Sequence, residues 1–456
     1  MLIELLIGIN IILMIAYYLN GRVLLHPAVI ICAMFALADL AAIVGNLTWH
    51  YQLHFITCAV IWSALFAFVL LASFASTITS KIGEDHDALN IRVPSGWFII
   101  FLFIAGLVLT ALNVRHFQSV AGSSGWNGFL QFGSDLKTVR DATTLGRVQN
   151  SGITGLATYY TRAVAFVGIY LFFYLTVVCK KRYSQYLYLW LPCVPYLVNI
   201  IISSGRTALT GFVVYLINIY GILIMSTREV SSDAKRNFIK NLLIIVAIFF
   251  ALFFVVGMLR QGDLGKGNFM LNLLNGFTLY VGFSIPSLDT FLTQGWTKPD
   301  VFGVNTLVEW YSFLNMLGFN VPNNLSGALA PISISGTLGN LFTGLRRYLQ
   351  DYSYTGMFLL MGVQGFISSF SFNYIHKKIN HPILFILYSI WIYPVFEMME
   401  EERFLMGLGI TPIYTLVSIV IMYYIMAKWD FKFNKIHTLK NVFDYELYDQ
   451  NSKYYY

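Results

Sequence analysis

Long apolar runs separated by short polar connections make up almost the whole chain. Each run is close to the roughly 20 residues that an α-helix needs to cross the hydrocarbon core of a bilayer. In hydrocarbon, backbone N–H and C=O groups must be paired within the segment, so each run is predicted to be a spanning helix. About eleven spans are predicted: Leu2–Leu19, Ala28–Val44, His54–Ile78, Gly96–Val114, Leu156–Val178, Leu187–Ser203, Ala208–Met225, Asn241–Leu259, Tyr354–Ile375, Pro382–Met398 and Gly407–Ala427.

Two connections between the spans are long, namely Arg115–Thr154 and, above all, Arg260–Ser353. The larger loop is rich in aromatic and aliphatic residues interrupted by Gly and Pro, which favours short amphipathic helices lying against the membrane surface. The predicted fold is an all-α polytopic membrane protein forming one integral membrane domain. Its parts are the first eight spans in 1–259, the large loop in 260–353, the last three spans in 354–427 and a tail in 428–456.

Composition and charge placement agree with this prediction. The chain is 57% hydrophobic and only 11% charged, and its net charge of +7 comes from basic residues gathered at helix ends. These residues lie in alternate connections, at 180–182, 228–240 and 377–378, and in the tail. The positive-inside rule therefore predicts an extracytoplasmic N-terminus, a cytoplasmic C-terminus and two long extracytoplasmic loops. The basic charge is thus attributed to contacts with membrane lipids, and no nucleic-acid partner is expected.

Familiar catalytic motifs of soluble enzymes are missing. The sequence contains no G-x-x-x-x-G-K-[ST] phosphate loop, no H-E-x-x-H motif, no nucleophile elbow and no Cys/His cluster. Asp85-His86-Asp87 matches the D-x-D pattern of metal-dependent nucleotide-sugar enzymes, but it lies in a short predicted cytoplasmic loop and is interpreted as a solvated acidic turn. We therefore expect neither a cofactor nor a metal.

Arginines at the predicted extracytoplasmic ends of spans are the main candidates for chemistry. Charges near membrane depth are costly and tend to be paired or functional. The planar guanidinium suits phosphate oxygens, although such arginines also snorkel onto lipid headgroups. These candidates are Arg206, Arg260, Arg346 and Arg347.

Acidic candidates occur in the large loop and after the tenth span. They are Asp263, Asp289, Asp300, Glu309 and Asp351, followed by Glu397, Glu400, Glu401 and Glu402. Asp351 follows Arg347 by four residues, so on a helix it is expected to neutralise one of the two neighbouring arginines.

Three short motifs resemble the Wzy-type O-antigen and oligosaccharide repeat-unit polymerases, which are kin to the O-antigen ligases. Ser203-Ser204-Gly205-Arg206-Thr207-Ala208-Leu209 looks like the family's small-residue turn with an arginine opening a helix. The stretch from Tyr280 through Ser284-Ile285-Pro286-Ser287-Leu288-Asp289 to Thr306 is similar to its aromatic-Gly-Pro segment. Asn340 through Gly356 resembles its entry to the next span, where the family commonly carries Gly in place of Ser353.

The resemblance implies a GT-C-like glycosyltransferase in the bacterial plasma membrane that joins undecaprenyl-diphosphate-linked glycans on the outer face. It also implies a chain-length regulator and a flippase of the same pathway as partners. Arginines would stabilise the charge that develops on the diphosphate leaving group. The residues expected to serve catalysis are Arg206, Arg346, Arg347 and Asp351, and those expected to bind substrate are Arg260, Tyr280, Asp289 and Glu309.

Other functions stay open at this point. An O-antigen ligase would pass the same donor to lipopolysaccharide core, and the sequence does not exclude it. A lipid-linked oligosaccharide flippase would need charges lining a path through the spans, whereas the predicted spans are nearly free of charge. A non-catalytic scaffold would not depend on Arg206.

Overall fold

The computed structural model describes residues 1–83, 91–121, 152–202, 206–227, 240, 244, 274–322, 332–378 and 380–428, and these are mostly helical. Several expectations lie outside these residues: Arg260, the Asp85-His86-Asp87 motif, nearly all of the span predicted at Asn241–Leu259, and the tail beyond residue 428.

Seven helices among the described residues are long and apolar enough to cross a membrane, so the chain is a polytopic membrane protein. They overlap seven of the predicted spans. They are α1 (Leu2–Leu19), α2 (Pro27–Trp49), α3 (Phe55–Thr79), α4 (Gly96–Ala121), α6 (Gly152–Phe173, continued by the π-helical turn η1, Tyr174–Val178), α8 (Arg206–Met225) and α13 (Leu345–His376).

Three further predicted spans form shorter apolar helices. The predicted span Pro382–Met398 is interrupted after α14. Pro394 is the local cause, because it has no N–H to continue the helix. The segments are η2 (Tyr183–Gln185), η3 (Leu187–Trp190) and α7 (Cys193–Ile202); α14 (Pro382–Trp391) and α15 (Tyr393–Glu397); and η5 (Met406–Leu408) with α16 (Ile410–Ala427).

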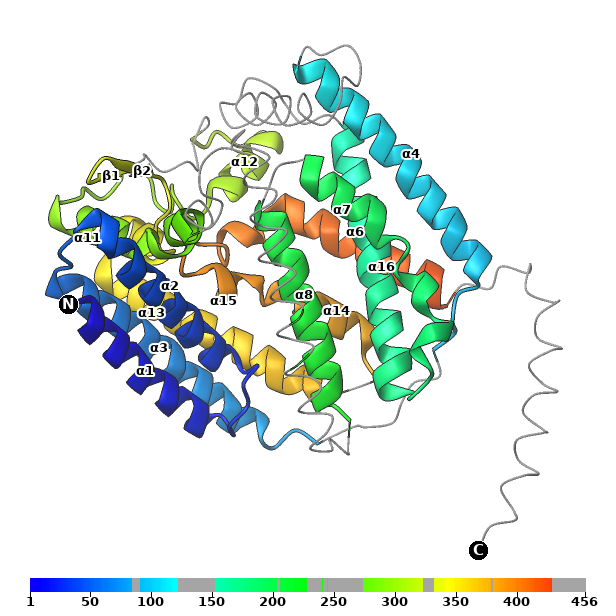
Figure 1. The fold of residues 1–456 in the computed structure, drawn as a ribbon, viewed down its shortest axis with the longest axis horizontal. Coiled ribbons are helices and arrows are strands. Elements are labelled where there is room, and N and C mark those ends of the chain that lie inside the picture. Colours follow the sequence, from blue (N-terminus) through cyan, green and yellow to red (C-terminus); the bar gives the residue numbers. More distant parts are fainter. Residues whose placement is uncertain are drawn as a thin grey trace, which may run out of the picture.

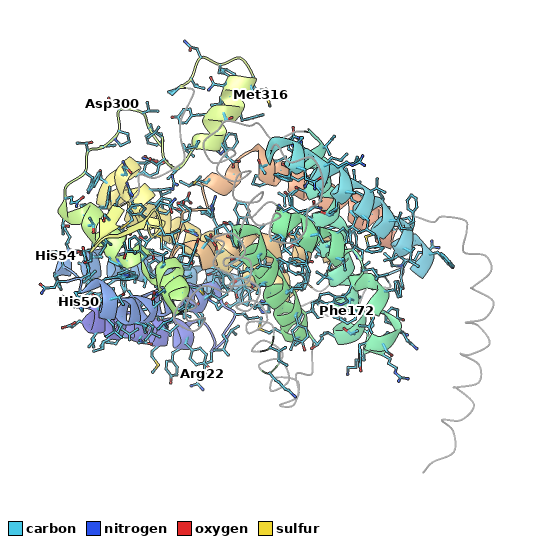
Figure 2. The ribbon with its side chains drawn as sticks, turned by 45° about the horizontal axis from the view of Figure 1, so that its top comes forward. Arg22, His50, His54, Phe172, Asp300 and Met316 are labelled. Atoms are coloured by element: carbon cyan, nitrogen blue, oxygen red, sulfur yellow. The ribbon has the colours of Figure 1, made fainter. Side chains whose placement is uncertain are left out.

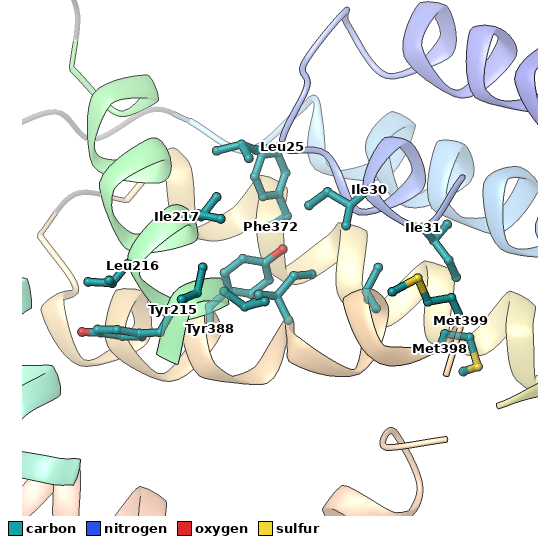
Figure 3. Packing of buried hydrophobic residues seen from close by; sticks show 14 of the residues in the cluster. Leu25, Ile30, Ile31, Tyr215, Leu216, Ile217, Phe372, Tyr388, Met398 and Met399 are labelled. Atoms are coloured by element: carbon teal, nitrogen blue, oxygen red, sulfur yellow. The ribbon is translucent and has the colours of Figure 1, made fainter. Parts of the chain in front are cut away.

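The helices form two groups joined by a bridge (Figure 1). In one group α1, α2, α3 and α13 pack together, and in the other α4, α6, α7 and α16 do so. Helices α8, α14 and α15 lie between the groups, with α14 contacting α8, α6 and α13. Figure 3 shows this bridge from close by, with Tyr388 of α14 near Phe372 of α13 and Ile217 of α8.

Glycines set the closest approaches in the first group. A Cβ atom on Gly365 of α13 would lie 2.4 Å from the backbone oxygen of Phe68 in α3. One on Gly282 would lie 2.5 Å from the backbone of Ala41 in α2. These contacts let backbones pack directly against each other, as is common where helices associate in membranes.

The described part of the large loop contains η4 (Thr278–Gly282), α11 (Ser284–Thr293) and α12 (Val308–Met316). Short helices are therefore present, as expected, but α11 is buried along nearly its whole length. A β-hairpin was not predicted: β1 (Ile332–Ile334) pairs antiparallel with β2 (Thr337–Gly339). Its turn residues Ser335 and Gly336 both have positive φ, which suits a two-residue hairpin turn.

Ser353 interrupts α13 at the point where the ninth span was predicted to begin. Its φ of 62° and ψ of −174° are non-helical and lie in a region that essentially only glycine adopts without strain. The helix is thus divided into an entry segment, Leu345–Tyr352, and a long segment from Tyr354 onward.

We expect Ser353→Gly to stabilise the protein by about 1 kcal/mol, because glycine relieves the backbone strain at this φ and ψ. The matched control is Ser371→Gly in the regular part of the same helix, which should destabilise by about 1 kcal/mol. Thermal unfolding of the purified protein in detergent, followed by tryptophan fluorescence, measures both. A lower melting temperature for Ser353→Gly would contradict the interpretation.

Candidate functional site

Three segments that are far apart in the sequence meet at the entry segment of α13. They are the entry segment itself, residues 303–309 leading into α12, and the connection 398–409 that follows α15. The Gly344 N–H donates to the Met398 carbonyl at 2.8 Å. A Cβ atom on Gly344 would lie 2.4 Å from the Met398 sulfur, so the two segments pack without space for a side chain. We call the ionisable residues gathered here the charged cluster: Arg346, Arg347, Asp351, Glu309, Glu397, Glu401, Glu402 and Arg403.

Arg347 is the best-partnered residue of the charged cluster. Its side chain is only 2% exposed, and its Nε and Nη2 atoms donate to the two carboxylate oxygens of Glu401 at 2.6 and 3.1 Å. Its Nη1 atom donates to the Asn305 carbonyl at 2.9 Å. This forked geometry is the strongest arrangement available to an arginine and a carboxylate. One side chain thereby connects all three segments.

The expected pairing of Asp351 with one of the arginines is wrong for the described residues. Its carboxylate instead accepts hydrogen bonds from the backbone N–H of Asn305 and Thr306, at 3.0 and 2.9 Å. The Asn305 amide and the Thr306 hydroxyl donate to it at 2.7 and 2.8 Å. A carboxylate with so many donors is already satisfied, so Asp351 orders the loop before α12.

Arg346 has no such partner. Its guanidinium carbon lies 3.7 Å from the ring centroid of Phe342 and 4.8 Å from that of Phe291, so the cation lies between two buried aromatic rings. Its Nε and Nη1 atoms are buried and have no hydrogen-bond acceptor among the residues described here. Buried donors without acceptors are rare and costly, which makes Arg346 the most unusual residue of the charged cluster.

Glu402 is a structural member of the charged cluster. It accepts from the Tyr348 hydroxyl at 3.0 Å and from the backbone N–H of Leu405 and Met406 at 2.7 and 3.1 Å. Burial raises the pKa of this carboxyl, and the N–H donors oppose that rise. Glu402 therefore orders the turn that leads into η5.

Glu309, in the first turn of α12, has a different environment. Its Oε2 atom is buried without a hydrogen-bond partner in the described part of the chain, and a Cβ atom on Gly409 would collide with it. Burial raises the pKa of Glu309, while the positive charge of Arg403 lowers it. A partly buried carboxyl with a raised pKa and one cationic neighbour is typical of a general acid or base.

Asp289 and Tyr280 are not part of the charged cluster. Asp289 is fully buried and accepts from the Tyr51 hydroxyl, the His54 N–H and the His54 ring at 2.6, 2.9 and 2.8 Å, and from Thr57. It thus caps the N-terminus of α3 and raises the pKa of Tyr51, whose burial contributes most to that rise. Tyr280 lies in η4, which packs on α2. Both residues hold the loop on the helices.

Arg206 is the first residue of α8, and the sequence predicted that this arginine opens a helix. Its side chain is not among the described parts of the chain. Further along the same helix, a Cβ atom on Gly211 would lie 3.8 Å from the Tyr393 ring of α15, the helix that ends at Glu397. Figure 1 shows α8 beside α15.

Sequence reasoning noted the acidic run after the tenth span but did not assign Glu401 to Arg347, since 54 residues separate them. It did not place Arg403 beside Glu309 or Glu397 either. The only signal available was an unusual density of charge, Glu400 to Arg403, directly after an apolar segment.

The charged cluster lines neither of two pockets among the described residues. One of these, of about 920 Å³, is lined by Asn20, Arg22, Ser76, His376 and Lys377. Figure 2 shows Arg22 on the side of the molecule opposite to Asp300 and Met316 of the large loop. Within the described ranges, no group of three or more His, Cys, Asp and Glu side chains could hold a metal ion.

Comparisons with known proteins add no relative. No family model, no curated protein and no solved structure matches the chain. The function has to be argued from the residues themselves.

We expect loss of either Arg347 or Glu401 to destabilise the protein by about 3 kcal/mol, because each change leaves a buried or partly buried charge without its partner. The variants are Arg347→Gln and Glu401→Gln, with Glu400→Gln as the neighbouring control. In a double-mutant cycle Arg347 and Glu401 should be strongly coupled, whereas Arg347 and Glu400 should be additive. Melting temperatures in detergent report the energies, and additivity of both pairs would contradict the assignment.

Proposed function

We propose that the protein is a polymerase that joins undecaprenyl-diphosphate-linked oligosaccharide repeat units into a surface polysaccharide on the outer face of the bacterial plasma membrane. In this proposal the large loop and the charged cluster are extracytoplasmic and the C-terminus is cytoplasmic. A flippase would supply the repeat units and a chain-length regulator would act on the product.

The observation that carries the proposal is Arg346. A permanent cation lies buried between two phenylalanine rings, with two nitrogen donors that lack acceptors in the described structure. An anion with several oxygens, such as a diphosphate, would satisfy these donors and neutralise the charge. The neighbouring Arg347 is not available for this role, because Glu401 occupies its fork.

The reaction needs no cofactor, because the diphosphate linkage stores the driving force. The acceptor hydroxyl oxygen attacks C1 of the donor glycan, the bond between C1 and the diphosphate oxygen breaks, and undecaprenyl diphosphate leaves with both electrons. Negative charge grows on that leaving group, so a guanidinium that is already in place stabilises the transition state more than the ground state.

Glu309 is the carboxylate best suited to take the proton of the acceptor hydroxyl. One of its oxygens is unpartnered within the described residues, its raised pKa makes it a stronger base, and Arg403 keeps part of it ionised. By contrast, Asp351 and Glu402 are fully engaged by hydrogen bonds.

We expect Arg346→Met to lower the rate of polymer formation by about 100-fold, the usual cost of removing a transition-state donor. Its melting temperature should stay unchanged or rise, because the variant removes an unsatisfied buried charge. Arg346→Lys should recover part of the activity, since it restores charge without the fork. The measurement is polymerisation of purified lipid-linked repeats in detergent.

The matched control is Arg22→Met, which removes an arginine that also lies over an aromatic ring, Tyr18, but is exposed at the other end of the molecule. It should polymerise normally. Normal polymer from a stable Arg346→Met variant would show that Arg346 only fills space between Phe291 and Phe342.

The activity should also depend on pH through Glu309. A general base works only when ionised, and burial raises its pKa above the ordinary 4.5, so activity should fall as the pH drops through a midpoint above 4.5. Glu309→Gln should lower the rate of polymer formation by about 100-fold or more and abolish the fall in activity at low pH, the acidic limb of the pH profile. Arg403→Gln should move the limb to higher pH, because the charge that favours the carboxylate is lost.

Asp300→Asn serves as the control, since Asp300 is an exposed loop carboxylate and its loss should leave the pH profile unchanged. Initial rates between pH 4 and 8 give the profile. An unshifted limb in Arg403→Gln together with an active Glu309→Gln would rule out Glu309 as the base.

A further inference from the structure

Arg162 lies inside the predicted span Leu156–Val178, although the predicted spans are nearly free of charge. This residue belongs to α6 and lies about 15 Å along the helix axis from Gly152, the first residue of that helix. The surrounding segment Gly152–Val178 is long and apolar enough to cross a membrane. A charged side chain at such a depth is expensive and usually marks a functional site.

The partners of Arg162 are neutral. Its Nη1 atom donates to the Thr415 hydroxyl of α16 at 3.2 Å, and its side chain lies beside the Tyr196 hydroxyl of α7. Its Nε atom is buried without an acceptor in the part of the chain that the structure describes. No carboxylate of the described residues forms an ion pair with it. Two hydroxyl groups solvate the guanidinium, but among the described residues its charge has no counter-charge, so an external anion would stabilise this site.

The packing of α6 on α8 places Arg162 at the level of the second turn of α8. Phe166 stacks on Tyr215, with centroids 4.1 Å apart, and further along Phe173 packs against Tyr220 at 5.0 Å. Because the residue number rises in both helices from the first contact to the second, the two helices run parallel. Extending this register backward by four residues brings Arg162 level with about Gly211, roughly one and a half helical turns from Arg206 along the axis.

The same end of α8 also leads to the charged cluster. Gly211 lies against the Tyr393 ring, and α15 ends at Glu397, whose charge interacts with Arg403. Helix α8 therefore lies between α6, which carries Arg162, and α15, which leads to the charged cluster. A ligand that reaches from the membrane interior to the charged cluster would pass this point.

We infer that Arg162 binds the diphosphate of a polyprenyl-linked substrate from within the helix bundle. The identity of the anion rests on the proposed function. The anion-binding role rests on the uncompensated charge itself. A lipid carrier fits this position, because its diphosphate would meet the arginine while its chain stays among apolar helices.

The experiment measures binding directly, with farnesyl diphosphate as a short lipid diphosphate probe. The purified full chain in detergent is titrated, and the shift in melting temperature is followed. We expect a saturable shift for the native sequence and none with farnesol, which has the same hydrocarbon and no charge. Arg162→Gln should weaken the apparent affinity by about tenfold or more, the effect of losing a hydrogen bond to a charged group. Arg162→Lys should recover part of it.

Thr415→Val is the matched control, because it removes the hydroxyl partner of Arg162 but leaves the charge in place. It should bind the probe nearly as well as the native sequence. Equal losses of stability and binding in Thr415→Val and Arg162→Gln would show that the contact only ties α6 to α16, and would overturn the inference. So would unchanged binding by a stable Arg162→Gln, or no response to the probe by the native sequence.

The outcome is separable from that of the polymerase assay. If farnesyl diphosphate binds and Arg162→Gln abolishes binding, the inference holds even when purified lipid-linked repeats are not polymerised, and the proposed function alone fails.

Discussion

The forked contact between Arg347 and Glu401 determines where the three segments of the candidate site meet. Taking both charges out of water is costly, and the cost is recovered only when geometry and further hydrogen bonds are good. Here the third donor of Arg347 reaches the Asn305 carbonyl, and Asp351 on the same helical segment holds the backbone of Asn305 and Thr306. The position of α12, and with it of Glu309, depends on these contacts. Glu401 is taken up by Arg347, and two donors of the neighbouring Arg346 are left without an acceptor among the described residues.

Much of the fold was predictable because the bilayer permits few alternatives. A run such as Phe55–Thr79 has no other way to pair its backbone in hydrocarbon, and the sequence placed its limits to within a residue or two. The hairpin at Ile332–Gly339 was missed, because two strands of three residues carry too little alternation to be recognised. The strain at Ser353 could not be read from a serine, although the boundary it creates was expected there.

The site was predictable in its residue types and not in its pairings. Arg346, Arg347 and Glu309 were selected from charge and position, and the structure brings them near one another. Local spacing suggested Asp351 as the counter-charge, but a carboxylate from 54 residues away took that role, because loop N–H groups offered Asp351 more donors. Arg162 was overlooked because one arginine barely lowers the hydropathy of a long apolar run. The proposed anion-binding role of Arg162 can be recognised only from the structure, which shows that its neighbours are hydroxyl groups.

The cap that Asp289 places on α3 has a consequence for biosynthesis. Its main-chain donor, the His54 N–H, lies 235 residues earlier in the chain. At roughly 5–20 residues per second, the ribosome needs on the order of 10–50 s to synthesise the intervening chain. During that interval α3 is made while the carboxylate that closes its N-terminus does not yet exist. The first helical hairpins must therefore wait in the bilayer with an open end, and seating of α11 completes them as a late step of assembly.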